Sequence, residues 1–185
     1  MAFRMGIGLL VGLMLFCSHC QIAAAPEVEP EEGASGAIWS EGEFVSPNGE
    51  CRVELKRYPL GGFLVLTFKQ GQTKSVNDVT GIAWASAETL VYTVSSIYSD
   101  QPGVYSYNCH SHRVKRLVAP IARNAAHPKD YFQMQSVTKS RPIIIYFYYA
   151  KAVDKESFTN SESRAHLYQV YVDGTGFQKA NQPPK

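Results

Sequence analysis

Phe44-Val45-Ser46-Pro47-Asn48-Gly49-Glu50 is a turn sequence that stands directly before a hydrophobic segment at residues 51–57. Proline, asparagine and glycine favour tight turns, and alternating apolar and polar residues favour strands. Two further hydrophobic segments follow at residues 62–68 and 73–76, each after a short connecting stretch. The same order of turn, strand, loop, strand, tight turn and short strand recurs twice farther along the chain. We therefore predict one antiparallel β-unit that is written three times.

The second and third copies carry the same kind of strand-forming residues, mainly tyrosine, valine and isoleucine. Their hydrophobic segments are residues 82–86, 90–95, 103–109 and 114–118 in the second copy, and 134–138, 142–149, 166–172 and 177–179 in the third. Residues 143–149 are apolar throughout, which predicts a central strand covered on both faces. Asp173-Gly174-Thr175-Gly176 predicts a hairpin turn. Because one such unit cannot bury its own faces, a stacked or radial array is expected.

Three of these motifs resemble a known family of repeats. Ser46-Pro47-Asn48-Gly49-Glu50 resembles the S-P-D-G-K turn that opens a blade in TolB-like, WD40-like β-propeller repeats. Residues 166–177 are similar to the later hairpin of that repeat, and Trp84 falls where the repeat often has its tryptophan. The second unit has Ala85-Ser86-Ala87-Glu88 in place of the turn motif, and the third keeps only the hairpin. The resemblance covers about residues 38–180 and implies blade-like β-units, but no particular function.

The number of units limits the architecture. Propellers close with about four to eight blades, so three units leave open faces and edges. We predict an all-β domain of three blade-like antiparallel units in a partial, open propeller-like arrangement. Its edges would be covered by the segment around Trp39 and by the long loops. Closure by oligomerisation and a β-sandwich of two packed sheets are the alternatives.

The amino end has the layout of a signal peptide. Arg4 precedes the apolar residues 6–16, and small residues run to Ala25. An uncleaved anchor is the alternative, and Phe16 and His19 disfavour lipidation of the cysteines that follow them, Cys17 and Cys20. This predicts a periplasmic or secreted protein. The expected divisions are a signal peptide (1–25), a disordered acidic linker (26–37), a β-repeat domain (38–181) and a frayed tail (182–185).

Signal removal leaves two cysteines, Cys51 and Cys109. An even pair in an oxidising compartment predicts a disulfide, with two buried free thiols as the alternative. Closing a loop of roughly sixty residues would contribute about 4 kcal/mol in the chain-entropy model.

The charge is unevenly distributed along the chain. Residues 26–50 hold seven acidic side chains and no lysine or arginine, whereas the rest of the mature chain holds 17 basic and 9 acidic side chains. A basic body favours an acidic partner, an anionic polymer or lipid headgroups, although ordinary solubility charge also explains it. The basic residues are scattered, which argues against a nucleic-acid face.

No set of catalytic residues stands out. Zinc-protease, Walker and dinucleotide motifs are missing from the sequence, and Ser136-Val137-Thr138-Lys139 lacks the companion motifs of penicillin-binding enzymes. His110 and His112 beside Cys109 have the side chains of a soft-metal site, but a polar hairpin turn explains them better. We predict a protein that is not an enzyme and that needs no cofactor or metal.

The loops between the second and third strands of each unit are expected at one rim, and loops on a rigid sheet commonly bind. Two of these loops are long and polar, residues 95–102 and 151–164. The segment between the second and third units, residues 120–131, is expected at the same rim. The leading hypothesis is an exported non-catalytic protein-binding domain, an inhibitor or immunity-type protein that plugs a secreted hydrolase with a long polar loop. The predicted partner-binding residues are Ser95, Ser96, Tyr98, Ser99, Asp100 and Gln101.

Periplasmic immunity proteins of type VI secretion amidase effectors are similar in size and plan to this chain. The alternative is an envelope accessory module that binds cell-wall polymer or an envelope complex, as TolB-like propellers do. A remnant of a propeller-bearing peptidase ranks last, because the chain has no room for a separate catalytic domain. Neighbouring polar residues on one rim favour the first hypothesis, and the basic body favours the second.

Overall fold

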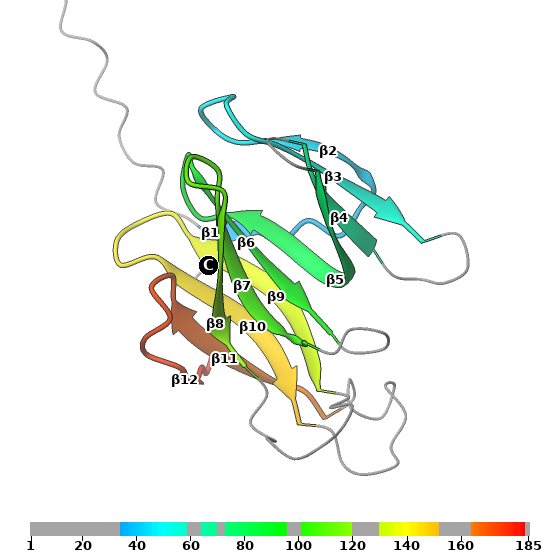
Figure 1. Cartoon of the computed structure of the whole chain (residues 1–185). Helices are drawn as coiled ribbons and strands as arrows, with labels where there is room; N and C mark the ends of the chain where they lie inside the picture. Colours follow the sequence, from blue (N-terminus) through cyan, green and yellow to red (C-terminus); the bar gives the residue numbers. More distant parts are fainter. Residues whose placement is uncertain are drawn as a thin grey trace, which may run out of the picture.

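The computed structural model describes residues 34–58, 64–69, 73–95, 101–119, 130–151 and 164–183. These residues form β-strands and no helix, arranged as two antiparallel sheets that do not close into a barrel, so the prediction of an all-β fold is confirmed (Figure 1). The strands are β1 (Ala34–Gly36), β2 (Gly42–Val45), β3 (Arg52–Arg57), β4 (Leu64–Phe68), β5 (Lys74–Trp84), β6 (Thr89–Val94), β7 (Gly103–Asn108), β8 (Arg113–Val118), β9 (Tyr131–Thr138), β10 (Ile144–Ala150), β11 (His166–Tyr171) and β12 (Gln178–Lys179).

Each sheet is built mainly from strands that follow one another along the chain. The larger sheet has seven strands in the order β2-β3-β4-β5-β6-β7-β8. The smaller sheet has five, in the order β1-β9-β10-β11-β12. Antiparallel neighbours need only short connections, which is why successive strands pair. The first two predicted units therefore share one hydrogen-bonded sheet, and the third forms most of the other.

The long strand β5 bends sharply and divides the larger sheet into two layers (Figure 1). Its first part pairs with β4 and its second part with β6, with irregular register around residues 79–81. Asp78 and Gly81 adopt positive φ angles of 58° and 146°, which carry the chain through the bend. As a result, β2, β3 and β4 fold back over β6 and β7.

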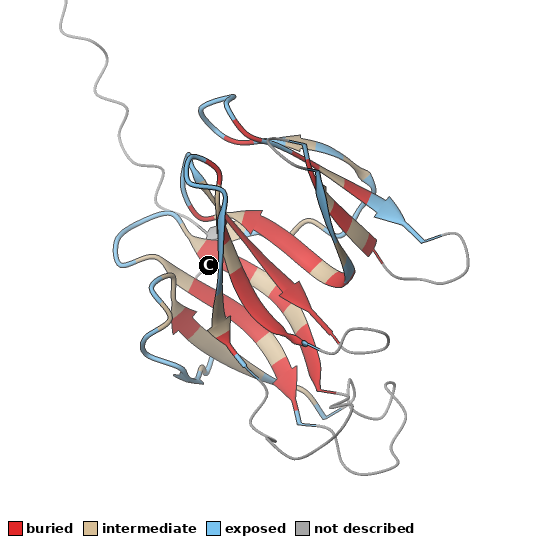
Figure 2. Cartoon of the chain, viewed as in Figure 1, coloured by how far each residue is buried: buried red, intermediate tan, exposed pale blue. Residues whose placement is uncertain are grey.

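Two hydrophobic cores separate the three layers that result. In the first core, side chains of β3 and β4 such as Leu55 and Leu66 pack with Leu90 and Tyr92 of β6. In the second core, Val91 of β6 packs with side chains of the smaller sheet. Because neighbouring residues of a strand point to opposite faces, β6 contributes to both cores and is buried along nearly its whole length (Figure 2).

Strand β6 is therefore covered on both faces. Residues 143–149 were predicted to form such a central strand, and β10 is indeed the middle strand of the smaller sheet, but its second face is covered only in part. Ile145 and Phe147 lie in the second core, whereas on the other face Tyr146 is buried and Ile144 and Tyr148 are half-buried. An apolar run alone did not distinguish the two strands, because tyrosine also suits a half-exposed face.

The amino-terminal segment joins the two sheets. Residues 34–36 pair with β9, and the main chain of Ile38 exchanges hydrogen bonds of 2.8 and 3.1 Å with Ile82 in β5. The prediction that the disordered linker runs to residue 37 was therefore wrong over its last four residues. The backbone N–H and C=O groups of residues 34–36 form hydrogen bonds with the edge of β9, and amino-acid composition does not reveal such a contact. Trp39, which follows Ile38, lies against Gly81. A Cβ added at Gly81 would come within 2.7 Å of the indole nitrogen of Trp39.

Candidate functional site

The predicted binding loops begin and end at one end of the molecule. Of the predicted partner-binding residues, Ser96, Tyr98, Ser99 and Asp100 lie outside the described residues, as do residues 152–163. The described ends of these two loops can be located through their contacts. Ser95 hydrogen-bonds to Phe132, Phe132 pairs with Tyr149, and Tyr149 pairs with His166. The roots of both long loops therefore lie together, and we call this the loop end.

Ser95 itself has a structural role. Its side chain is 1% exposed, and its hydroxyl donates to the carbonyl oxygen of Phe132 and accepts from its N–H, both at 2.6 Å. This burial corrects the prediction that Ser95 contacts a partner. Gln101, at the other end of the same loop, is exposed, and its carbonyl oxygen accepts a hydrogen bond of 2.6 Å from Tyr105. Gln101 stays a predicted partner-binding residue.

Two threonines extend the contact of Ser95 into a polar seam between the sheets. Strand β1 pairs only with residues 136–138 of β9, so the preceding edge of β9 needs other partners. Thr93 accepts from the N–H of Met134 at 3.0 Å, and Thr80 donates to the carbonyl oxygen of Phe132 at 2.5 Å. Buried main-chain groups are costly when unpaired, so these hydroxyls fix β9 against β5 and β6. No local sequence pattern indicates this seam, because its partners lie 37 to 52 residues apart.

Beside the seam, the adjacent ends of β10 and β11 form a hollow of about 500 Å³, which we call the rim hollow. It is lined by Tyr149, Ala150, Lys151, Arg164, His166 and Tyr168. The three basic side chains are exposed, whereas Tyr149 is buried. The Tyr149 hydroxyl donates to Asp130 at 3.0 Å, and the Tyr168 ring stacks on Phe177 with centroids 5.2 Å apart. The hollow thus combines a basic mouth with an aromatic wall.

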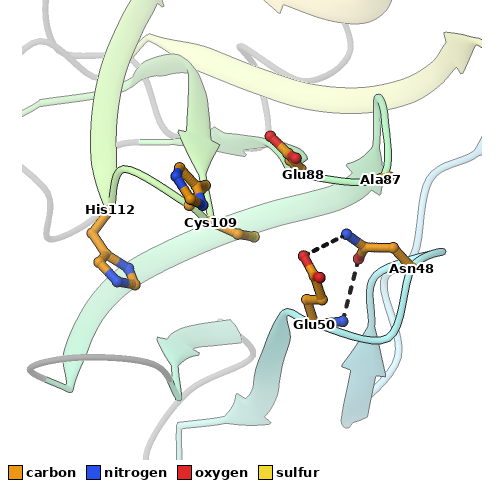
Figure 3. Close-up of a pocket in the computed structure, with 7 residues that line it drawn as sticks. Asn48, Glu50, Ala87, Glu88, Cys109 and His112 are labelled. Carbon is orange, nitrogen blue, oxygen red and sulfur yellow. Dashed lines mark hydrogen bonds between the residues drawn. The ribbon is translucent and has the colours of Figure 1, made fainter.

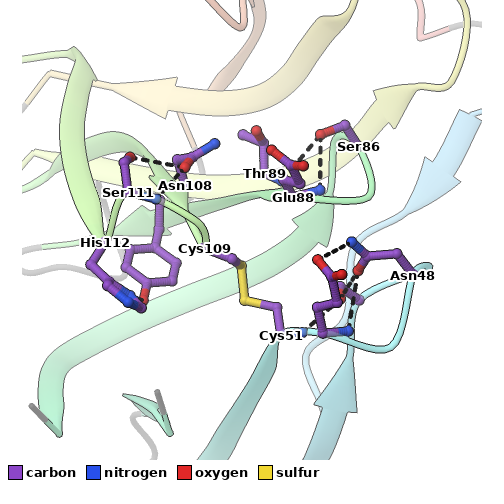
Figure 4. Close-up of a disulfide and its surroundings, with 12 residues drawn as sticks. Asn48, Cys51, Ser86, Glu88, Thr89, Asn108, Cys109, Ser111 and His112 are labelled. Atoms are coloured by element: carbon purple, nitrogen blue, oxygen red, sulfur yellow. Dashed lines mark hydrogen bonds between the residues drawn. A yellow bond between two sulfur atoms is a disulfide. The ribbon is translucent and has the colours of Figure 1, made fainter. Parts of the chain in front are cut away.

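The opposite end of the molecule carries the disulfide and short turns (Figure 4). Cys51 and Cys109 are bonded, with Cα atoms 5.9 Å apart, so the predicted disulfide is confirmed. The bridge joins the start of β3 to the end of β7, that is, two layers of the larger sheet. In the turn before it, Ser46 accepts from the N–H of Cys51 at 2.9 Å, and Gly49 has the positive φ expected of a turn glycine.

A second hollow, of about 320 Å³, lies at this disulfide end (Figure 3). It is lined by Asn48, Glu50, Ala87, Glu88, Cys109, His110 and His112. Cys109 is oxidised and His112 lies 3.0 Å from the Tyr107 hydroxyl, so two of the three side chains considered for a soft metal are engaged in other contacts. Within the described part of the chain, no group of three or more metal-ligating side chains is assembled. Asn48 donates to Glu50 at 2.8 Å, which stabilises the turn.

The shifted pKa values fall outside the rim hollow. Burial raises the pKa of Tyr92, Tyr105 and Tyr107 in the first core. Hydrogen bonds from Lys56 and Lys69 lower the pKa of Glu54 on the outer face of β3, and hydrogen bonds from Thr175 lower the pKa of Asp173 in the last hairpin turn. These shifts mark core packing, a surface ion-pair group and a turn.

Among the residues that the structure describes, there is no helix long and apolar enough to cross a membrane. No protein-family model matches the chain, and no curated protein sequence matches it either. The likenesses to TolB-like repeats and to immunity proteins thus depend on the motifs and the plan of the chain alone.

Proposed function

We propose that this chain is an exported, non-catalytic domain that binds a protein partner through its loop end. The observation that carries the proposal is the convergence of the roots of two long polar loops on a rigid base. Ser95 holds the root of the first loop to β9, and β9 pairs directly with β10, from which the second loop leaves. Loops that leave a rigid scaffold side by side are well suited to recognition, because the fixed positions of their ends reduce the conformational entropy that is lost on binding.

The layered arrangement supports a blade-like interpretation of the fold. Strands β2 to β5, β5 to β8 and β9 to β12 make three four-stranded groups, and β5 serves two of them. The second strands of the three groups, β3, β6 and β10, point toward the same side of the molecule (Figure 1). This is the plan expected of a partial, open propeller-like array with its recognition loops on one rim.

The sharpest form of the proposal is an inhibitor or immunity-type protein that inserts residues 96–100 into the cleft of a secreted hydrolase. Serine hydroxyls and a carboxylate can occupy polar positions of a cleft, and Tyr98 would supply buried area. The disulfide is compatible with an oxidising, extracytoplasmic compartment. We expect a dissociation constant near 1 nM, about −12 kcal/mol.

The test is affinity capture of the mature, oxidised chain from envelope and secreted fractions, followed by mass spectrometry. A stoichiometric partner should be retained by the native chain and lost when Tyr98→Ala and Asp100→Ala are combined. His110→Ala, at the disulfide end, is the matched control and should retain it. Loss of the partner from the control but not from the loop variant would contradict the proposal.

A second candidate function is favoured by the basic mouth of the rim hollow and by the excess of basic residues after residue 50. In this alternative the chain is an envelope accessory module that binds an anionic cell-wall polymer. Exposed charge pairs are screened by salt, so sedimentation with purified cell wall should fall steeply between about 0.05 and 0.5 M salt. A protein complex with a buried loop should resist the same change.

A further inference from the structure

Antiparallel pairing gathers three basic side chains at one place on the loop end. Tyr149 and His166 are directly opposite in the β10–β11 pair, so the residues beyond them meet where the strands part. Lys151 directly follows β10, and Arg164 lies shortly before β11. Both line the rim hollow together with His166. Arg164 has further contacts of its own, so Lys151 and His166 are the more readily available of the three.

The wall behind this basic mouth is aromatic and already tied into the core. The rings of Tyr149 and Tyr168 meet edge to face at 5.5 Å, and Tyr168 stacks on Phe177. The fully buried carboxylate of Asp130 accepts from the Tyr149 hydroxyl and so holds that ring in place. A group entering the hollow would therefore meet both aromatic rings and basic side chains.

This combination selects one ligand chemistry. Carboxylates form charge-assisted hydrogen bonds with lysine, arginine and protonated histidine that are stronger than neutral ones. The rings favour an adjoining apolar or aromatic group. We propose that the rim hollow is a carboxylate-binding site that receives an acidic segment of the partner, with an aspartate or glutamate next to an aromatic residue.

A peptide segment fits better than a polymer chain for two reasons. The hollow is contributed by the ends of only two strands, and its volume of about 500 Å³ suits one or two side chains rather than a running polymer. It also lies at the end from which the proposed recognition loops leave. The identity of the occupant as part of a protein partner rests on the proposed function, whereas its carboxylate chemistry rests on the hollow alone.

The experiment is a titration of the mature, oxidised chain followed by nuclear magnetic resonance. The probes are acetyl-Glu-Phe-Glu-amide and its uncharged counterpart acetyl-Gln-Phe-Gln-amide. We expect saturable shifts of the His166 and Tyr168 resonances with the acidic probe, and binding of the uncharged probe about tenfold weaker, because the charge-assisted bonds are lost. Lys151→Gln and His166→Gln should each weaken the acidic probe about threefold or more.

Lys74→Gln and His110→Gln are the matched controls, because they remove the same side chains from exposed positions outside the rim hollow. Equal binding of both probes, no binding of either, or equal weakening by the controls would overturn the inference. Loop-dependent capture of a partner could still succeed in that case, so the proposed function would stand. Conversely, specific peptide binding without any captured partner would support the carboxylate-binding site but contradict its occupation by a protein partner.

A polymer arm separates the two sources of carboxylate. Polygalacturonate and purified cell wall are offered to the native chain and to Lys151→Gln. If the polymer displaces the acidic peptide and its binding is lost in the variant, the hollow belongs to the polymer, and the peptide assignment is overturned. If Lys151→Gln abolishes binding of the acidic peptide but leaves binding of the polymer unchanged, the polymer binds elsewhere and the peptide assignment is supported.

Discussion

The disulfide end and the loop end of this molecule are held together by different kinds of contact. At the disulfide end, a covalent bond between Cys51 and Cys109 and short turns fasten β3 to β7. At the loop end, the hydroxyls of Thr80, Thr93 and Ser95 fasten β5 and β6 to the main chain of β9. Contacts between residues far apart in the chain hold both ends, with a separation of 58 residues for the disulfide and 37 to 52 for the hydroxyls. The two ends therefore differ in the kind of bond, which is covalent at one end and a set of hydrogen bonds at the other.

The two devices also secure different pairs of layers. The disulfide crosses the first core, between the two halves of the larger sheet, and the polar seam borders the second core, between the sheets. Each device can therefore be weakened by itself.

Replacing both Cys51 and Cys109 by alanine should cost the most. The bridge closes a long loop of 58 residues, and removing it should lower the free energy of unfolding by about 4 kcal/mol. Guanidinium unfolding of the oxidised native chain and the variant measures this difference. If the two ends are independent, amide exchange at Phe132 should keep its protection relative to the global unfolding rate. Loss of that protection alone would show that the ends are coupled.

Gly81→Ala tests the bend where the amino-terminal segment meets both sheets. The added Cβ would lie 2.7 Å from Met134 Cβ and from the indole nitrogen of Trp39, at a φ of 146°. Overpacking and backbone strain together should cost about 3 kcal/mol. Gly49→Ala is the control, since its Cβ would meet nothing within 4 Å while φ is also positive, so only strain of about 1 kcal/mol remains. Equal losses in both variants would remove the packing explanation.

Ser95→Ala tests the polar seam. The substitution leaves the buried N–H of Phe132 without its partner, which should cost about 2 kcal/mol, while the carbonyl oxygen keeps its hydrogen bond from Thr80. Ser140→Ala is the control, because that serine is exposed. Thermal unfolding and amide exchange measure the effect, and the increase in exchange should be largest in β9 near residue 132. A loss of stability spread evenly over both ends would contradict a local role for the seam.

The smallest effect concerns acid pH at the last hairpin turn, which lies against β8. Hydrogen bonds from Thr175 to Asp173 hold the pKa of that carboxyl below its usual value of 3.8 in the folded chain. The carboxylate therefore adds stability above the unfolded pKa, and this contribution is lost as the pH falls through the lower, folded pKa. Thr175→Val should raise the pKa of Asp173, as followed by carboxyl carbon resonances. An identical titration in native chain and variant would refute the assignment.

Local chemistry accounts for the features that were predicted well. Turn residues at 46–50 and 173–176 and alternating strand patterns indicated an all-β chain, and two cysteines left after signal removal indicated one bond. The candidate site was predicted less well. The end from which its loops leave followed from counting strands, but Ser95 was assigned to a partner because a serine at a strand end has the same local signal whether it is exposed or buried.

Sequence alone determined the strand content of this protein, its two best-formed turns and the pairing of Cys51 with Cys109, because each depends on residues close in the chain or on a count. The tertiary structure decided the bend in β5, the burial of β6 between two cores and the role of residues 34–38 as a link between the sheets. It also decided that hydroxyls of β5 and β6 satisfy the edge of β9. Such contacts join main-chain groups to side chains tens of residues away, and no local pattern records which distant partner a buried hydroxyl will find.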